Sequence, residues 1–230
     1  MPNRILVFIT VLFLLTSCKL ELDGEIYVAD VIDVGEGKGT LNTPMNLSFE
    51  MSSENKCNED KKEISNILSN YFINFVAKEC YSEDFNSFLK IGADIPIIFD
   101  SEQDGKVMIS DKSVINFSVL KWENEKYFGY NASVALNSQM YDSISKEIKK
   151  KYYQTLKLNK TKIELAINND GRETEEIRFA GAFVNGKPVV FPEMFKIERR
   201  QKIDFLGSNV TTATFDQNKH AFVFQIIKNK

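Results

Sequence analysis

Apolar and polar side chains alternate along the chain that follows residue 18. One alternating set comprises Leu20, Leu22, Ile26, Val28, Ile32 and Val34, and a second comprises Leu41, Met45, Leu47, Phe49 and Met51. A period of two is typical of strands that bury one face. The two sets therefore predict two strands joined by the glycine-rich turn 35–39. A phosphate site is not expected at this turn, because phosphate loops lead into a helix and a strand is predicted here.

A helical period comes next along the chain. Apolar side chains stand at offsets 0, 3, 4, 7, 8, 11 and 12 in the series Ile64, Ile67, Leu68, Tyr71, Phe72, Phe75 and Val76. This spacing puts them on one face of an amphipathic helix, for which Asn58 is the expected N-cap. A second helix is predicted at 138–153, with a shared face made of Tyr141, Ile144, Ile148 and Tyr152.

Strands account for most of the remaining pattern. They are predicted at 85–91, 95–99, 114–122, 126–136, 162–167, 176–184, 187–191, 195–205 and 221–227. Asn185-Gly186 suits the two-residue turn of a hairpin, and Pro188, which lacks an N–H, favours an edge strand. The order of elements predicts an α+β fold with mostly antiparallel sheets and two main amphipathic helices.

The segment before Cys18 has the form of a secretory signal. Arg4 precedes an apolar run of eleven residues, 5–15, which is about half of the ~20 residues that a membrane-spanning helix needs. The sequence Leu15-Thr16-Ser17-Cys18 that closes the run resembles the bacterial lipoprotein signal class. This resemblance implies diacylglycerol on Cys18, cleavage before it and acylation of the new amino terminus. The alternative is an ordinary cleaved signal in which the cysteine has no role.

Export and lipidation define where we expect the protein to act. The resemblance divides the chain into a signal peptide at 1–17 and a mature lipidated chain at 18–230. The mature chain is expected to be one α+β domain, or two closely packed halves with a boundary near 100–113. Lys19 stands where an inner-membrane retention signal usually has Asp, so the expected location is the cell envelope. The lipid would anchor the protein to the outer membrane, facing the periplasm or the cell surface.

Two further cysteines are expected to form a disulfide. Exported chains with two cysteines usually join them, so Cys57 and Cys80 are predicted to pair. A helix from 59 to 77 would be ~28 Å long and would hold them too far apart for a disulfide. We therefore expect the helix to end near Phe72 and a strand from 73 to 80 to fold back along it.

Composition excludes some partners. Removing residues 1–17 takes away Arg4 and no acid, which leaves 28 basic and 32 acidic residues. This mildly acidic balance offers no basic surface for nucleic acid. The chain has a single histidine, His220, and no nucleophile motif, so we identify no catalytic constellation and expect no cofactor. Hydrophobic residues make up 43% of the chain, which is enough to bury a full core.

The segment 100–111 is the best candidate for a metal site. It presents oxygen ligands and a turn glycine at spacings that resemble a calcium loop, with Asp100, Glu102, Asp104 and Asp111 as the ligands. Glu at position 3 is too long, Asp at position 12 is too short, and the segment before the loop is predicted to be a strand. The alternative, a surface hairpin turned at Asp104-Gly105 that binds no metal, is the prediction we retain.

Aromatic residues near the turn 123–125 are the candidate binding side chains. Trp122, Tyr127 and Tyr130 would stack on a sugar or grip a partner if they are exposed. The alternative is ordinary packing of these rings across neighbouring strands of the core.

Location and fold favour a binding role. The stretch 22–28, directly after the expected lipid, resembles envelope lipoproteins of bacterial and phage genomes. We expect a non-enzymatic, membrane-anchored envelope lipoprotein that binds a protein or another envelope component near the membrane. The alternative is an envelope hydrolase that uses carboxylates, with or without calcium. An enzyme should gather acids in a concave pocket, whereas a binding module should expose an apolar or aromatic patch.

Overall fold

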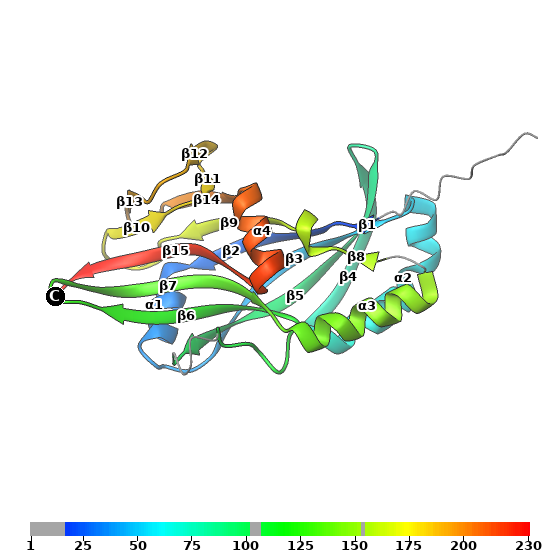
Figure 1. Ribbon diagram of the computed structural model, residues 1–230, viewed down its shortest axis with the longest axis horizontal. Helices are drawn as coiled ribbons and strands as arrows, with labels where there is room; N and C mark the ends of the chain where they lie inside the picture. The colour runs from blue at the N-terminus through cyan, green and yellow to red at the C-terminus, as the bar shows by residue number, and fades with distance from the viewer. Residues whose placement is uncertain (1–16, 102–106, 153–154) are drawn as a thin grey trace, which may run out of the picture.

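The computed structural model describes residues 17–101, 107–152 and 155–230 (Figure 1). Four α-helices lie in these ranges: α1 Val28–Gly35, α2 Glu54–Leu68, α3 Ser138–Tyr152 and α4 Asn209–Asn218. Two short 3-10 helices lie at Ser69–Tyr71 and Leu158–Lys160. The described strands are β1 Ser17–Cys18, β2 Leu20–Tyr27, β3 Leu41–Met51, β4 Ile73–Glu83, β5 Asn86–Asp100, β6 Ile115–Glu123, β7 Tyr127–Leu136, β8 Thr155–Leu156, β9 Lys162–Asn168, β10 Glu175–Phe179, β11 Ala182–Val184, β12 Lys187–Val189, β13 Glu193–Ile197, β14 Lys202–Gly207 and β15 His220–Asn229.

One large sheet organises the molecule. Its strand order is β12-β11-β14-β9-β2-β3-β5-β6-β7-β15-β10-β13, and β4 pairs with β5 outside this order. Neighbours are antiparallel except for the parallel pairs β2 with β9 and β5 with β6. β1 and β8 form a separate parallel pair. Buried side chains from strands along the whole sheet belong to one core cluster, so the sheet curves around its own apolar face.

The two ends of the sheet approach one another. β10 and β11 lie near opposite ends of the strand order, yet only Ala180 and Gly181 separate them along the chain. The buried ring of Phe179, at the end of β10, bridges the gap. Its centroid lies 6.2 Å from that of Phe205 on β14 and 6.3 Å from that of Phe224 on β15. Aromatic packing therefore joins the two ends of the sheet.

The expected α+β class with two main helices is wrong. Over the described residues the structure is mostly β, with one large curved sheet that is nearly closed and four α-helices around it. The physical reason is that the sheet buries its apolar face against itself, so the helices have little of it left to cover. α3, for example, contributes only Ile144 and Ile148 as buried side chains. Alternating strands look the same in sequence whether helices or other strands cover them.

The first predicted strand is too long, because its second half is α1. Val28, Val31 and Val34 are buried at a spacing of three, which matches a helical face as well as an alternating one. Gly35 ends this helix against the ring of Tyr130, where a Cβ atom would lie only 2.2 Å from the ring. The glycine-rich segment is therefore a loop from a helix to β3, and the expected hairpin turn is absent.

The region around the disulfide agrees with the reasoning from the cysteines. α2 ends at Leu68, and after the short 3-10 helix β4 returns alongside it. Cys57 and Cys80 form a disulfide with a Cα–Cα distance of 6.0 Å. The N-cap differs from the expectation, since Ser53 rather than Asn58 accepts a hydrogen bond from the backbone N–H of Lys56. The helix consequently starts five residues earlier.

Several boundaries in the remaining chain differ from the predictions. The strands expected at 85–91 and 95–99 are one continuous strand, β5, and β6 runs parallel to it. β5 and β6 therefore do not form a hairpin with one another, and the turn expected at Asp104-Gly105 lies outside the described residues. The predicted strands 176–184 and 195–205 are each divided in two, and α4 was not predicted. The hairpin turn at Asn185-Gly186 is present, and Pro188 lies on an edge strand as expected.

Candidate functional site

The backbone at Cys18 is paired into the fold. Cys18 lies opposite Leu156 in the parallel pair of β1 and β8. The expected signal at 1–17 lies outside the described residues except for Ser17, and the side chain of Cys18 is outside them too. Among the residues that the structure describes, no helix is long and apolar enough to cross a membrane. The backbone of Cys18 therefore joins the folded domain directly, without an intervening linker.

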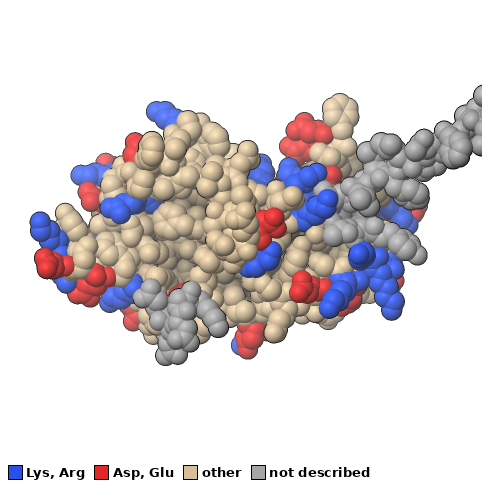
Figure 2. All heavy atoms as spheres, in the orientation of Figure 1, with Lys and Arg blue, Asp and Glu red and all other residues tan. Residues whose placement is uncertain are grey.

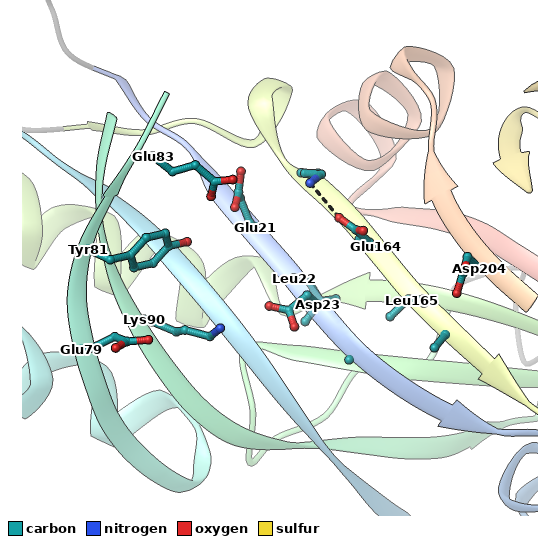
Figure 3. Close-up of a pocket in the computed structure, with 13 residues that line it drawn as sticks. Glu21, Leu22, Asp23, Glu79, Tyr81, Glu83, Lys90, Glu164, Leu165 and Asp204 are labelled. Atoms are coloured by element: carbon teal, nitrogen blue, oxygen red, sulfur yellow. Dashed lines mark ion pairs between the residues drawn. The ribbon is translucent and has the colours of Figure 1, made fainter. Parts of the chain in front are cut away.

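An acidic groove of about 740 Å³ crosses the outward face of the sheet. It is lined from β2, β4, β5, β9 and β14 (Figure 3). The side chains alternate along these strands with buried ones, which is why their polar atoms share one face. The ionisable and phenolic residues that line the groove are Glu21, Asp23, Glu79, Tyr81, Glu83, Lys90, Lys162, Glu164 and Asp204.

Local partners hold several of these groups. Lys162 forms an ion pair with Glu164 at 2.7 Å, and this hydrogen bond raises the pKa of Lys162. Asp23 accepts a hydrogen bond of 2.9 Å from the amide of Asn46. In Figure 3 the carboxylates of Glu21 and Glu83 point toward one another from β2 and β4. The groove therefore presents negative charge to a ligand from at least two strands.

The polar face of β2 continues beyond the groove at Glu25. Its carboxylate accepts hydrogen bonds from Lys202 at 2.6 Å and from Asn168 at 2.7 Å. The hydrogen bond from Lys202 is the main cause of a lowered pKa of Glu25. These contacts tie β2 to β9 and β14. We therefore assign Glu25 a structural role rather than a place in the groove.

The calcium candidates are only partly described. Glu102 and Asp104 lie outside the described residues. Asp100 is buried and accepts hydrogen bonds from the backbone of Met108 at 3.1 Å and from the Ser118 hydroxyl at 3.0 Å. Asp111 is exposed. Within the described ranges, no group of three or more His, Cys, Asp and Glu side chains is placed to hold a metal ion.

The aromatic candidates do not form one exposed surface. Tyr130 is buried in the core, with its ring against Gly35 and 6.4 Å from that of Phe128. Trp122 is half-buried beside Gly129, its neighbour across β6 and β7. Tyr127 alone of the three is exposed. The core-packing interpretation therefore fits two of the three rings.

An apolar surface that was not predicted lies on β11 to β13. We call the exposed side chains of Phe183, Pro188, Val190, Phe191 and Met194 the apolar edge. Phe183 and Pro188 are directly paired across β11 and β12, and Val190 and Phe191 are 71% and 81% exposed. Figure 2 shows mostly uncharged side chains over this part of the molecule. The run Pro188-Val189-Val190-Phe191-Pro192 was the available sequence signal, since two prolines there limit burial in a sheet.

A second exposed aromatic stands at the tip of the β4–β5 hairpin. Asp84 and Phe85 form its two-residue turn with φ values of 46° and 67°, and the Phe85 side chain is fully exposed. Non-glycine residues in this left-handed region cost roughly 1–2 kcal/mol. A bulky residue held there without burial is a candidate for function, because strain persists where another requirement outweighs it.

Comparison with known proteins identifies a family. A family model described as a domain of unknown function, DUF7424, matches residues 20–230. No curated protein and no solved structure matches the chain. The match begins two residues after Cys18 and covers the whole sheet from β2 to β15, with the groove, the apolar edge and the hairpin tip.

Proposed function

We propose that this chain, which belongs to the DUF7424 family, is a lipid-anchored envelope protein that binds a protein partner and has no enzymatic activity. The signal-like segment that ends at Cys18 supports the anchor, and Lys19 supports the outer membrane. The observation that carries the binding role is the apolar edge. Figure 1 shows β12 and β13 at the end of the molecule opposite to β1, so an anchored domain would present this edge away from its lipid.

Burial of the apolar edge provides the driving force for binding. A large apolar side chain that moves from water into an interface gains about 1.5–3 kcal/mol. Val190 and Phe191 are the most exposed of these side chains and are expected to contribute most. In the described part of the chain β13 pairs only with β10, so its other edge is open to an extended segment of the partner.

Site-specific crosslinking tests the binding role. A photoreactive amino acid replaces Phe191 in the full chain in its source cells, and Val210 in the control. Val210 is also apolar and is 66% exposed, but it lies on α4. We expect one saturable product of defined mass from position 191 and none from position 210. Met194→Asp should reduce the product about tenfold. Equal labelling at the two positions would refute the proposal.

Acyl labelling tests the anchor. Cys18→Ala should abolish incorporation of labelled fatty acid and release the protein from the membrane fraction. Cys57→Ala combined with Cys80→Ala is the control, because it removes the two disulfide-bonded cysteines but leaves the expected lipid site intact. Labelled Cys18→Ala protein that still requires detergent for extraction would contradict the anchor.

The acidic groove favours a second candidate function, carboxylate-dependent hydrolysis. The supporting observation is that Glu21 and Glu83 point toward one another across a groove (Figure 3). Paired carboxylates can supply a general acid and a general base. The test is product release from purified envelope glycans and peptides. Glu21→Gln and Glu83→Gln should each abolish it, and Glu25→Gln should leave it unchanged. Absence of products from the wild-type chain would exclude this candidate.

A further inference from the structure

We infer that the β4–β5 hairpin inserts Phe85 into the surface of the membrane that holds Cys18. The inference rests on the proposed lipid anchor and extends it, since it assigns the domain a second contact with lipid. The hairpin extends from the body of the molecule, and β1 lies at its foot (Figure 1). The two features thus belong to the same end of the structure.

Contacts between neighbouring strands connect Cys18 to the hairpin. Lys19, the next residue, donates its backbone N–H to the Glu50 carboxylate at 2.8 Å and accepts from the Glu50 backbone at 2.9 Å. Glu50 pairs with Phe88 on β5. The ammonium of Lys19 lies 6.0 Å from the centre of the Phe88 ring. One strand, β3, therefore separates the lipid-bearing backbone from the hairpin.

The tip of the hairpin extends far enough for Phe85 to contact the membrane. Phe85 lies three residues beyond Phe88, which is about 10 Å at the rise of a strand. Side chains of interfacial segments enter the boundary between headgroups and acyl chains to a depth of about 5–10 Å. A domain that starts directly at an acylated Cys18 keeps its surface at the headgroups. The fully exposed ring at the tip is then within reach of the acyl boundary.

Bonds at the base of the hairpin hold the tip in position. Ser82 hydrogen-bonds Ser87 across the hairpin at 3.0 Å and donates to Glu54 of α2 at 2.8 Å. The disulfide from Cys80 to Cys57 ties the same strand to the same helix. Little conformational freedom remains to be lost when the tip enters the interface, which favours insertion.

The residues around Phe85 indicate the kind of lipid. Aromatic rings prefer the membrane–water interface, and a fully exposed phenylalanine gains by entering it. Glu83 and Asp84 flank the ring with negative charge and would be repelled by anionic headgroups. The surface that fits the tip is therefore zwitterionic. A pocket on a protein is the competing occupant, which the experiment distinguishes.

Tryptophan quenching tests the insertion. The chain has one tryptophan, so Phe85→Trp combined with Trp122→Phe leaves a single reporter at the tip. The acylated full-length protein is placed in phosphatidylcholine vesicles with or without bromine on the upper acyl carbons. We expect brominated lipid to quench the emission about twofold, because the ring sits at the acyl boundary. Phe191→Trp with Trp122→Phe, at the opposite end, is the control and should not be quenched.

The outcomes separate this inference from the proposed function. Mass spectrometry first establishes whether Cys18 carries acyl chains, and their absence would overturn the anchor and the insertion together. An acylated, vesicle-bound protein whose Phe85→Trp variant is not quenched would overturn the insertion alone. A variant that is not quenched in vesicles, but whose emission shifts to shorter wavelength in native envelopes, would place the tip in a protein pocket and also reject the inference.

Discussion

The two-residue turns of the β4–β5 and β11–β12 hairpins have the same backbone shape but different residues. Both central residues have positive φ in each turn, with values of 46° and 67° at Asp84-Phe85 and 48° and 74° at Asn185-Gly186. Asn-Gly is the preferred pair for this shape, because glycine adopts positive φ without a steric cost. Phenylalanine at the equivalent place is strained. The difference shows that Phe85 is not the residue that the backbone shape of its turn favours.

The two hairpins are also held in place by different means. None of the side chains of β4 is fully buried, and the strand is attached by its pairing with β5 and by the disulfide to α2. β11 and β12 bury Ala182, Val184 and Val189 in the core, next to strands that the Phe179 ring joins. One end thus depends on a covalent link and the other on packing, so different changes should weaken them.

Phe179→Ala should have the largest effect on stability. Its ring is fully buried and joins the two ends of the sheet, so its removal leaves a cavity where three other rings meet. Such substitutions cost about 3–5 kcal/mol. Urea unfolding measures the loss. Phe191→Ala is the control and should change the free energy of unfolding by less than about 0.5 kcal/mol, since this ring is exposed. Similar losses for both variants would contradict closure by Phe179.

Loss of the disulfide should weaken the other end. The bond closes a loop with a sequence separation of 23 residues, and the chain-entropy model assigns it roughly 3 kcal/mol. Cys57→Ala with Cys80→Ala should show this loss in urea. Hydrogen exchange should accelerate most in β4, because that strand has no buried side chain to hold it. Uniform acceleration that includes β10 and β11 would show that the two ends are not held independently.

Sequence reasoning succeeded where local chemistry decides the structure. The helical period predicted a helix in this region, and the two cysteines required it to end early and the following strand to return along it. Asn185-Gly186 correctly predicted a two-residue hairpin turn. Sequence reasoning failed where contacts between residues distant in sequence determine the structure. The parallel pairing of β5 with β6 and the contact of Phe179 with Phe205 leave no mark in the local pattern, so the α+β class was wrong.

The missed helices and surfaces have equally specific causes. α1 satisfies an alternating pattern because its valines fit both periods. α4 has a weak apolar face, with Thr211 and Phe215 as its buried residues, and its capping box has Thr211 where the usual sequence signature has Glu or Gln. The acidic groove could not be predicted because its acids are distributed over several strands whose order emerges only in the folded sheet.

Glu25→Gln should lower the free energy of unfolding by a smaller amount, and this loss should depend on pH. The hydrogen bond from Lys202 lowers the pKa of Glu25 in the folded chain, so folding favours the ionised form. This contribution is fully present above the unfolded pKa, near 4.5, and is lost as the pH falls through the lower folded value. We expect a loss of about 0.5–1 kcal/mol at pH 7 that shrinks as the pH falls below the unfolded pKa and through the lower folded pKa of Glu25. Thermal unfolding across this range measures it, and a pH-independent difference would contradict the assignment.

Exchanging residues between the β4–β5 and β11–β12 turns should change the free energy of unfolding least, and it tests whether Phe85 is strained. Phe85→Gly removes left-handed strain of about 1–2 kcal/mol but adds freedom to the unfolded chain, which leaves a net gain of roughly 0.5–1 kcal/mol. Gly186→Phe should lose roughly 0.5–1 kcal/mol, because the same strain and the same unfolded-chain entropy then act with opposite signs. A Cβ atom at Gly186 meets nothing within 4 Å, so this loss would come from backbone strain rather than from a clash. Thermal unfolding of both variants measures the changes. If Phe85→Gly destabilised the protein, the Phe85 ring would contribute to folding, and its exposure would need no second role. If it stabilises the protein as expected, the residue at the tip opposes stability, which supports a role for Phe85 in a contact outside the domain.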